Sequence, residues 1–472
     1  MLREEVTQDQ TTGNMKKPRV ALWHALLARS GTLAYIPIIV VAILMFVGAS
    51  WQFFWLHTDA ARYQCYALSF WIGGGAVKLL PSVQCKFLPA ATLSMPPLHA
   101  LPLEYPPLTL AIFSPALFAP LAYYQMAFAI FMALTAVFIY WLLLRYAPRG
   151  AALAFALYIL VGAWGTAAGR FDLIPAALTL LCVIAAERKH WTYAYIALAF
   201  GFLLKIYPLL FLPALFIAEQ MDAKRLYTPG SPLTIATFPG ELWRTMRGIS
   251  HWRWKNTLIF LGIVLGVTGF FALLDFQGAV LSQASYFANR PVQVESTGSS
   301  LLFLATLFGD PIQIVYSFGS INIISALGEP VALVFEALFV VGYLYVIFLQ
   351  WRGRLDITQA CIAILLVFIV TGKVFSPQYL MWLIPLLAYS GAFNRFWLII
   401  WSMISLVTTY IYPFLYTRTL NGLEVPYIPG FIEAVAVRNT LLVLLTLAYL
   451  FNWFQARKRQ MLPDEAAQVR EA

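Results

Sequence analysis

The chain has 472 residues, of which 61% are hydrophobic and only 11% charged, and its mean hydropathy is +0.76. Soluble globular proteins carry about 25% charged residues, and a bilayer solvates apolar surface that a water-soluble fold could not bury. The net charge of +10 does not indicate nucleic acid, because no basic segment carries a nucleic-acid recognition pattern. These properties exclude a soluble protein and predict a multi-pass membrane protein.

Long apolar runs divide the chain into about twelve predicted membrane spans, counted at about 15 to 25 residues for each span. We expect these spans near residues 32–54, 121–144, 151–166, 171–186, 191–205, 206–220, 257–274, 330–350, 358–372, 375–393, 397–416 and 436–455. The predicted fold is therefore one all-α membrane domain over 31–456, between polar tails at 1–30 and 457–472.

Most of the 31 lysines and arginines lie in the N-terminal tail and on alternate loops, as at Arg145, Arg149, Arg352 and Arg354. Basic residues concentrate on the cytoplasmic side of membrane proteins. Both termini are therefore predicted to be cytoplasmic, in a protein of the cell membrane. The loops on the other side are predicted to be extracytoplasmic, and the largest of them covers about 55–120.

This first outer loop contains several residues that bear on function. Asp59 either caps the helix that follows it or acts directly at a site, because HTD precedes a helix-like run. The apolar run 108–118 is too short to span a membrane and predicts a juxtamembrane helix or a re-entrant segment on the outer face. Cys65 and Cys85 share the loop, and the sequence leaves open whether they form a disulfide.

Isolated ionisable and polar residues gather at the predicted outer ends of the spans. Charges at membrane depth are costly and usually have a role. Their convergence on one leaflet predicts an active face there, formed by Asp59, Arg62, Tyr105, Arg170, Asp172, Lys205, Tyr207, Arg290, Glu295, Lys373 and Gln378.

Each of these residues also has a structural interpretation. Lys205 and Lys373 either bind a phosphate or extend from helix ends to the headgroups. Arg170 and Asp172 either belong to a site or form an ion pair across a short turn, and Arg290 is either a ligand or a surface arginine. The five histidines show no metal-ligand spacing, so no metal is predicted.

Six sequence segments, in the same order from about residue 30 to 392, resemble the GT-C membrane glycosyltransferases. They are similar above all to glycosyltransferase family 87, the bacterial α-mannosyltransferases that use polyprenol-phosphate mannose. The segments are TDAARYQCYA, YPPLTLAIFSPA, AAGRFDLIPAALTLL, LAFGFLLKIYPLLFLPAL, NRPVQVESTGSSLL and GKVFSPQYLMWLIPLLA.

The resemblance implies a GT-C-type bundle that transfers a hexose with inversion on the extracytoplasmic face. The donor would be a polyprenyl-phosphate sugar and the acceptor a lipid or glycan, within the membrane lipids and without cofactor or metal. In this family the acid of the first outer loop is the general base, which here is Asp59. The matching donor contacts would be Lys205 with Tyr207, Arg290 with Glu295, and Lys373 with Gln378.

Two alternatives remain at this level. Many spans with charges near one face also suit a transporter or a lipid flippase, although the chain has no internal repeat. A GT-C enzyme that uses another polyprenyl-linked sugar fits the same sequence segments.

Overall fold

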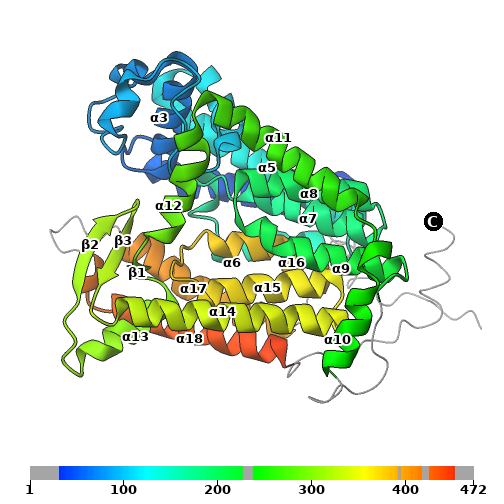
Figure 1. Ribbon diagram of the computed structural model, residues 1–472. Helices are drawn as coiled ribbons and strands as arrows, with labels where there is room; N and C mark the ends of the chain where they lie inside the picture. Colours follow the sequence, from blue (N-terminus) through cyan, green and yellow to red (C-terminus); the bar gives the residue numbers. More distant parts are fainter. Residues whose placement is uncertain (1–30, 227–237, 392–394, 417–424, 452–472) are drawn as a thin grey trace, which may run out of the picture.

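The computed structural model describes residues 31–226, 238–391, 395–416 and 425–451, so the predicted tails lie outside the described residues. The described chain is predominantly helical, and most of its helices run side by side along one axis (Figure 1). Helices occupy every apolar segment predicted as a span. The helical class of membrane protein predicted from the sequence is therefore confirmed.

Six helical segments of the described chain are long and apolar enough to cross a membrane. They are Thr32–Gln52, which contains α2 (Ile36–Ala49), Leu121–Tyr146, which contains α5 (Tyr124–Tyr146), α11 (Lys255–Leu274), α14 (Gly328–Trp351), Phe396–Leu415, which contains most of α17 (Arg395–Thr409), and α18 (Phe431–Leu450).

The other predicted spans correspond to shorter helices. They are α6 (Ala151–Gly162), α7 (Leu173–Glu187), α8 (Trp191–Leu204), α9 (Leu212–Asp222), α15 (Ile357–Thr371) and α16 (Tyr379–Gly391). At about 1.5 Å per residue, a 14-residue helix is about 21 Å long, which is less than the ~30 Å hydrocarbon core of a bilayer. Their lengths alone therefore do not establish the predicted count of about twelve spans.

Burial divides the helices into an inner and an outer set. Nearly every residue of α15 and α16 is buried, whereas α11 and α14 expose large apolar side chains, with Leu273 89% and Leu333 68% exposed. A helix that is apolar on all sides belongs in a protein core or in contact with lipid. The outward faces of α11 and α14 therefore have the composition of lipid-facing surface.

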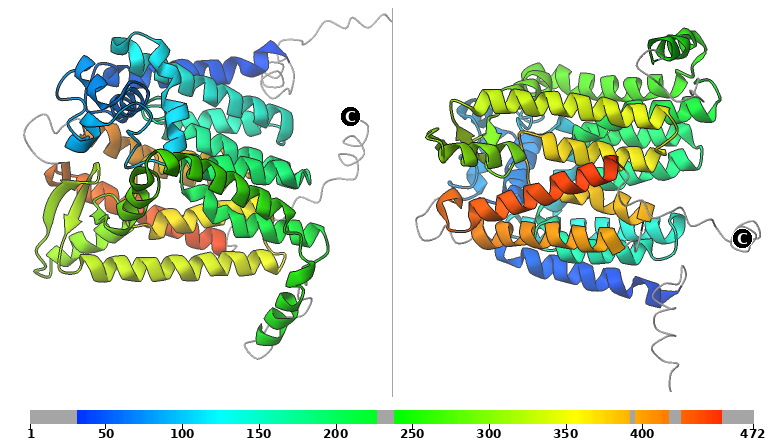
Figure 2. Two further views of the ribbon diagram at one scale, coloured as in Figure 1. Left: turned by 45° about the horizontal axis from the view of Figure 1, so that its top comes forward. Right: turned by 90° about the horizontal axis from the view of Figure 1, so that it is seen from below.

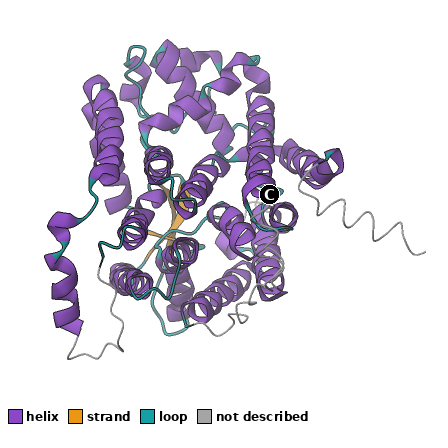
Figure 3. Cartoon of the chain, turned by 90° about the vertical axis from the view of Figure 1, so that its right-hand side faces the viewer, coloured by secondary structure: helices purple, strands orange, loops and turns teal. Residues whose placement is uncertain are grey.

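The two ends of the bundle differ in structure. One end carries α3 (Asp59–Ile72), α12 (Ser282–Ala288) and a small sheet, and the opposite end carries α9 and α10 (Phe238–Arg247) (Figures 1 and 2). From the α9 and α10 end, most helices of the bundle are seen end-on (Figure 3). The end with α3 is the one predicted to be extracytoplasmic.

The start of α3 resolves one of the alternatives for Asp59. Thr58 is the N-cap of this helix, and its side-chain oxygen accepts a hydrogen bond from the backbone N–H of Ala61 at 3.1 Å. The interpretation of Asp59 as the cap is therefore wrong. Because Thr58 supplies the cap, the Asp59 carboxylate in the first turn is available for other partners.

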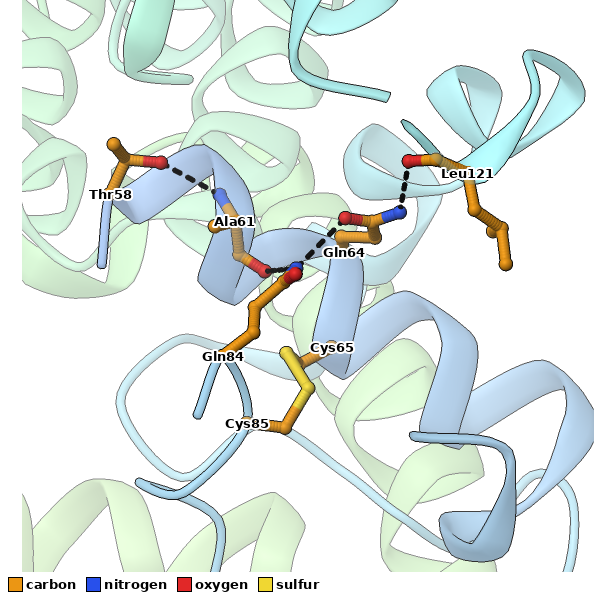
Figure 4. Close-up of a disulfide and its surroundings, with 7 residues drawn as sticks. All are labelled: Thr58, Ala61, Gln64, Cys65, Gln84, Cys85 and Leu121. Carbon is orange, nitrogen blue, oxygen red and sulfur yellow. Dashed lines mark hydrogen bonds between the residues drawn. A yellow bond between two sulfur atoms is a disulfide. The ribbon is translucent and has the colours of Figure 1, made fainter. Parts of the chain in front are cut away.

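A disulfide joins Cys65 in α3 to Cys85 in the following loop, with the two Cα atoms 5.8 Å apart (Figure 4). Gln84 extends this link, since its side-chain amide donates to the Ala61 carbonyl and to Gln64 Oε1. These contacts fix the loop after α3 against the helix that carries Asp59.

The apolar run after Tyr105 is a short, interrupted helical segment, as predicted. It comprises the 3₁₀ turns Pro107–Thr109 and Pro115–Phe118 with α4 (Leu110–Phe113) between them. Proline removes a backbone N–H and blocks the preceding helical turn, so Pro115 limits the length of α4.

The second predicted outer loop, between the predicted spans 257–274 and 330–350, contains a three-stranded antiparallel sheet, which the all-helical prediction did not include. Its strands are β1 (Val292–Gln293), β2 (Gln313–Ser317) and β3 (Ser320–Ile324), in the order β1-β3-β2. Val292 pairs with Ile323 and Tyr316 with Ile321. The sheet places residues 292–293 beside residues 322–323 of β3.

We expect Gln313 at one end of the bundle and Arg354 at the other to face opposite sides of the membrane. The test is labelling of Gln313→Cys and Arg354→Cys with a membrane-impermeant maleimide. Background should be low, because two native cysteines are buried and the other two form the disulfide. Gln313→Cys should label in intact cells and Arg354→Cys only after permeabilisation; the reverse pattern would contradict the predicted orientation.

Candidate functional site

Asp59 lies in the first turn of α3 and connects the first outer loop to the helix bundle. Its Oδ2 pairs with Arg170 Nη1, and Arg62 Nη1 lies 3.9 Å from its Oδ1. The Asp59 side chain is 13% exposed. The carboxylate therefore lies at a partly enclosed position between two cations.

Arg62 contributes to a second contact within the same loop. Its guanidinium pairs with Glu104 and lies 4.6 Å from the centroid of the Phe87 ring. Burial disfavours the charged form, but Glu104 and nearby tyrosines outweigh this effect and raise the pKa of Arg62. Arg62 therefore remains cationic and ties the segment before α4 to α3.

Asp172, the residue before α7, is the most deeply buried of the predicted site acids, at 1% exposure. Its Oδ1 accepts hydrogen bonds from Lys205 Nζ at 2.5 Å and from Trp382 Nε1 at 2.7 Å. The interpretation of Arg170 and Asp172 as an ion pair across their turn is wrong, because Arg170 pairs with Asp59 and Asp172 with Lys205.

Lys205 follows α8 and does not extend away from the protein. Besides its bond to Asp172, its ammonium lies 4.7 Å from the Phe171 ring centroid and 5.3 Å from that of Trp382. The interpretation of Lys205 as a snorkelling lysine is thus not supported. Arg170 and Arg290 both interact electrostatically with this ammonium, so the three cations lie in one region.

A cavity of about 280 Å³ opens beside Lys205, and we refer to it as the cation groove. It brings together three of the predicted phosphate-binding residues: Lys205, Arg290 and Lys373. The remaining lining residues are mainly apolar or aromatic: Ile206, Tyr207, Leu209, Leu210, Phe368, Gly372, Val374, Tyr379 and Trp382. The groove therefore combines apolar walls with three cationic groups.

Aromatic stacking shapes one wall of the cation groove. The Trp382 ring stacks on Tyr207 and on Tyr379, with each pair of centroids 4.1 Å apart. Offset-stacked rings hold one another in fixed orientations. Tyr207 therefore forms part of the groove wall. The ring stack to which it belongs contacts the Asp172–Lys205 pair through Trp382.

Arg290 is held at the groove by neutral groups. Its Nη1 donates to the Tyr286 hydroxyl at 3.0 Å and its Nη2 to Ser320 Oγ at 2.9 Å. Burial raises the pKa of Tyr286 to about 12, so this phenol stays neutral at physiological pH. Neither of these contacts neutralises the Arg290 charge.

Lys373 lies between the cation groove and a larger cavity of about 1040 Å³. Its ammonium is 3.8 Å from Glu336 Oε1, and the exposed fraction of the Lys373 side chain is 24%. Arg290 and Lys373 line both cavities, so an anion at these two residues would contact both spaces. Glu336 of α14 lies in the wall of the larger cavity.

Tyr105 lies in an aromatic cluster next to the groove residues and not in the groove lining. Its ring makes edge-to-face contacts with Tyr63 and Phe171, at centroid distances of 5.6 and 5.5 Å. Phe171 in turn lies under the Lys205 ammonium. Tyr105 therefore supports the region around Asp172.

Glu295 and Gln378 lie apart from the cation groove lining. Glu295 is 2% exposed and pairs with the fully buried Arg438 of α18 at 2.7 Å, while the Tyr416 hydroxyl donates to its Oε1. Gln378 accepts a hydrogen bond from Ser376 at 2.5 Å, just before α16. Both residues have partners that give them structural roles.

The buried Glu295–Arg438 pair nevertheless supports the groove through the backbone. Gln293, two residues before Glu295, donates its backbone N–H to the Lys373 carbonyl at 2.9 Å and accepts from the Phe375 N–H at 3.1 Å. These bonds couple β1 to the loop that carries Lys373. The buried ion pair therefore anchors one side of the groove.

Sequence reasoning missed Trp382, Tyr286 and Arg438. Trp382 and Tyr286 are aromatic residues in a chain with 15 Trp and 24 Tyr, so composition gave them no distinct signal. Arg438 could have been identified, because an arginine near the start of a predicted span needs a buried partner.

In a comparison with known proteins, no family model and no curated protein matches the chain. Within the part of the chain that the structure describes, no group of three His, Cys, Asp or Glu side chains has the arrangement of a metal site.

Replacing Arg438 with methionine should destabilise the protein by about 3 to 5 kcal/mol, because Glu295 would remain buried without a cation. Thermal unfolding of the purified protein in detergent measures this loss. The double variant Arg438→Met with Glu295→Gln is the control, and it should recover part of the stability. An unchanged unfolding temperature in Arg438→Met would contradict the anchoring role.

Proposed function

We propose that the protein is a membrane glycosyltransferase that moves a hexose, with mannose as the first candidate, from a polyprenyl-phosphate donor to a lipid or glycan acceptor. The observation that carries this proposal is the cation groove, in which Lys205, Arg290 and Lys373 meet apolar walls. The resemblance of the six sequence segments to the GT-C glycosyltransferases supports it independently.

The chemistry of the groove suits a lipid phosphate. Lysine binds phosphate as a point charge and arginine through a planar fork of donors. Isoprenoid chains have no polar atoms, and side chains such as Leu209, Leu210 and Phe368 offer them an apolar surface. A soluble sugar nucleotide would need polar contacts for its base and ribose, which these walls do not offer.

In the proposed reaction, the acceptor hydroxyl attacks the anomeric carbon of the donor sugar. A carbon–oxygen bond to the acceptor forms as the bond to the phosphate oxygen breaks, and the electron pair of that bond remains on the polyprenyl phosphate. The proton of the acceptor hydroxyl passes to Asp59, the proposed general base. Lys205, Arg290 and Lys373 stabilise the additional negative charge of the leaving phosphate.

Contacts around Asp59 support this assignment. The pairing with Arg170 orients the carboxylate, and Arg170 lies two residues before Asp172, the partner of Lys205. The proposed base and the proposed phosphate site are thus joined through one short segment, 170–172. Phosphate is a good leaving group, so a second catalytic carboxylate is not required, in contrast to glycosidases.

The proposal includes an orientation in the membrane. We propose that the six long helices and the six shorter ones together form about twelve spans of a GT-C-type bundle, with both termini cytoplasmic. The shorter helices α15 and α16, which are almost wholly buried, need not match the full bilayer thickness. The active face, with α3 and the cation groove, would be extracytoplasmic in the cell membrane.

The direct test is sugar transfer from radiolabelled polyprenyl-phosphate mannose by purified protein in lipid nanodiscs supplied with host lipid extract. Wild-type protein should move label into a new product, and Asp59→Asn should reduce the rate by at least about 10³-fold, because the base is lost. EDTA should leave the rate unchanged.

Transfer by Asp59→Asn at the wild-type rate would refute the role of Asp59. Absence of transfer from every polyprenyl-linked sugar tested would contradict the enzyme assignment and favour a transporter or flippase.

Arg290→Gln and Lys373→Gln should each weaken donor binding by about 10-fold or more, since a hydrogen bond to a charged group contributes about 1.5 to 3 kcal/mol. Equilibrium binding of a polyprenyl-phosphate sugar measures the change. Lys86→Gln is the matched control, because Lys86 is an exposed lysine of the first outer loop outside the groove. If all three variants bound the polyprenyl-phosphate sugar with equal affinity, the proposed role of the groove in phosphate binding would be refuted.

A further inference from the structure

A second polar cavity lies at the opposite end of the bundle, and we refer to it as the basal cavity. Its volume is about 580 Å³, and its lining comes from the first turns of α8 and α11, the segments just before them, and Glu219 near the end of α9. Its lining includes Lys189, His190, Glu219, Arg253 and Lys255. The distribution of basic residues predicts that this end is cytoplasmic.

The basal cavity has an excess of positive charge. Lys189 is paired with Asp222 at 2.7 Å, but Arg253 and Lys255 have no acidic partner within 4 Å among the described residues. The helices α8 and α11 both begin at the cavity, and neither start has a side-chain cap. Each helix N-terminus carries the equivalent of about half a positive charge, so the cavity favours an anion.

Buried hydrogen bonds hold this cavity in shape. Gln220, which is fully buried, donates to the Arg253 carbonyl at 3.1 Å and accepts from the Arg253 N–H at 2.8 Å. Thr192 donates to Asn256, which donates to Glu219 Oε1, both at 2.8 Å. The three helices are therefore fixed to one another around the cavity before any ligand enters.

Glu219 belongs to the same set of buried contacts. Its side chain is 1% exposed, its Oε1 accepts a hydrogen bond from Asn256, and it interacts with the buried Tyr195 of α8. Glu219 therefore helps to fix the three helices to one another, and the basic residues set the charge that the cavity presents to a ligand.

The surroundings of the cavity indicate a lipid as the source of such a phosphate. The lining includes Trp191, Tyr193 and Trp254, and tryptophan and tyrosine are enriched where protein meets the membrane interface. The apolar segment α11 begins at Lys255, directly beside the cavity. The cavity is therefore expected at the level of the lipid headgroups.

The neighbouring helix α10 has the pattern of a helix that lies on a membrane surface. Leu242, Trp243 and Met246 lie on one face and are all exposed, whereas Arg244 and Arg247 provide basic groups. An exposed apolar face combined with basic residues favours contact with anionic lipid. This helix precedes the segment that carries Arg253.

We propose that the basal cavity binds the headgroup of an anionic phospholipid from the cytoplasmic leaflet. Arg253, Lys255 and the starts of α8 and α11 bind its phosphate. This site is separate from the cation groove and does not depend on the transfer reaction.

Native mass spectrometry of the delipidated full-length protein tests this proposal. Phosphatidylglycerol, phosphatidylcholine, phosphatidic acid or glycerol-3-phosphate is added at matched concentrations. We expect retained phosphatidylglycerol in the wild type and about a 10-fold loss in the double variant Arg253→Gln with Lys255→Gln. The matched control is Arg145→Gln with Arg149→Gln, at another basic loop of the same end, and it should retain the lipid.

If the wild type retained phosphatidylcholine as well as it retained phosphatidylglycerol, the proposal would be overturned. Equal losses of phosphatidylglycerol in the two double variants would also overturn it. Tight binding of glycerol-3-phosphate without lipid would assign the cavity to a soluble phosphate compound instead.

Discussion

Asp172 is a carboxylate with almost no solvent contact, and the protein must balance its charge internally. A buried charge without a partner costs several kcal/mol, and Lys205 provides the partner at 2.5 Å. This ion pair joins the start of α7 to the end of α8. Because Trp382 donates to the same carboxylate oxygen, the pair also fixes the position of α16 at this end of the bundle.

The arrangement of the cation groove depends on this buried pair. The rings of Tyr207 and Tyr379 stack on Trp382 and form the aromatic wall of the groove. Lys205 itself supplies one of its three cations. Two residues before Asp172, Arg170 pairs with Asp59 of α3 and brings the first outer loop to the same region. The contacts around the Asp172–Lys205 pair thus hold Asp59, the cations of the groove and its apolar wall in one region.

The two ends of the molecule use similar side chains for different purposes. At the end with α3, buried ion pairs such as Glu295–Arg438 hold loops and a small sheet against the helices. At the opposite end, Arg253 and Lys255 have no acidic partner among the described residues, and their loop is held by Gln220. The end with α3 thus combines buried ion pairs with the cation groove, whereas the opposite end has basic residues without acidic partners among the described residues.

Several site residues could be predicted from the sequence because lone charges stand out in apolar surroundings. Lys205, Arg290 and Lys373 were selected for this reason, and the structure brings them together in one groove. Pairing partners could not be predicted in the same way. Arg170 has an acid two residues away in Asp172 but pairs with Asp59, which is 111 positions earlier in the chain (170 − 59).

The sequence by itself determined the helical membrane class, the approximate positions of the apolar helices and the identity of most charged residues at their ends. These features depend on local composition, because twenty apolar residues are incompatible with water wherever they occur. Only the tertiary structure decided which charge neutralises which, that Thr58 and not Asp59 caps α3, and that the second outer loop forms a sheet. Such outcomes depend on contacts between residues far apart in the chain, and local composition does not predict these contacts.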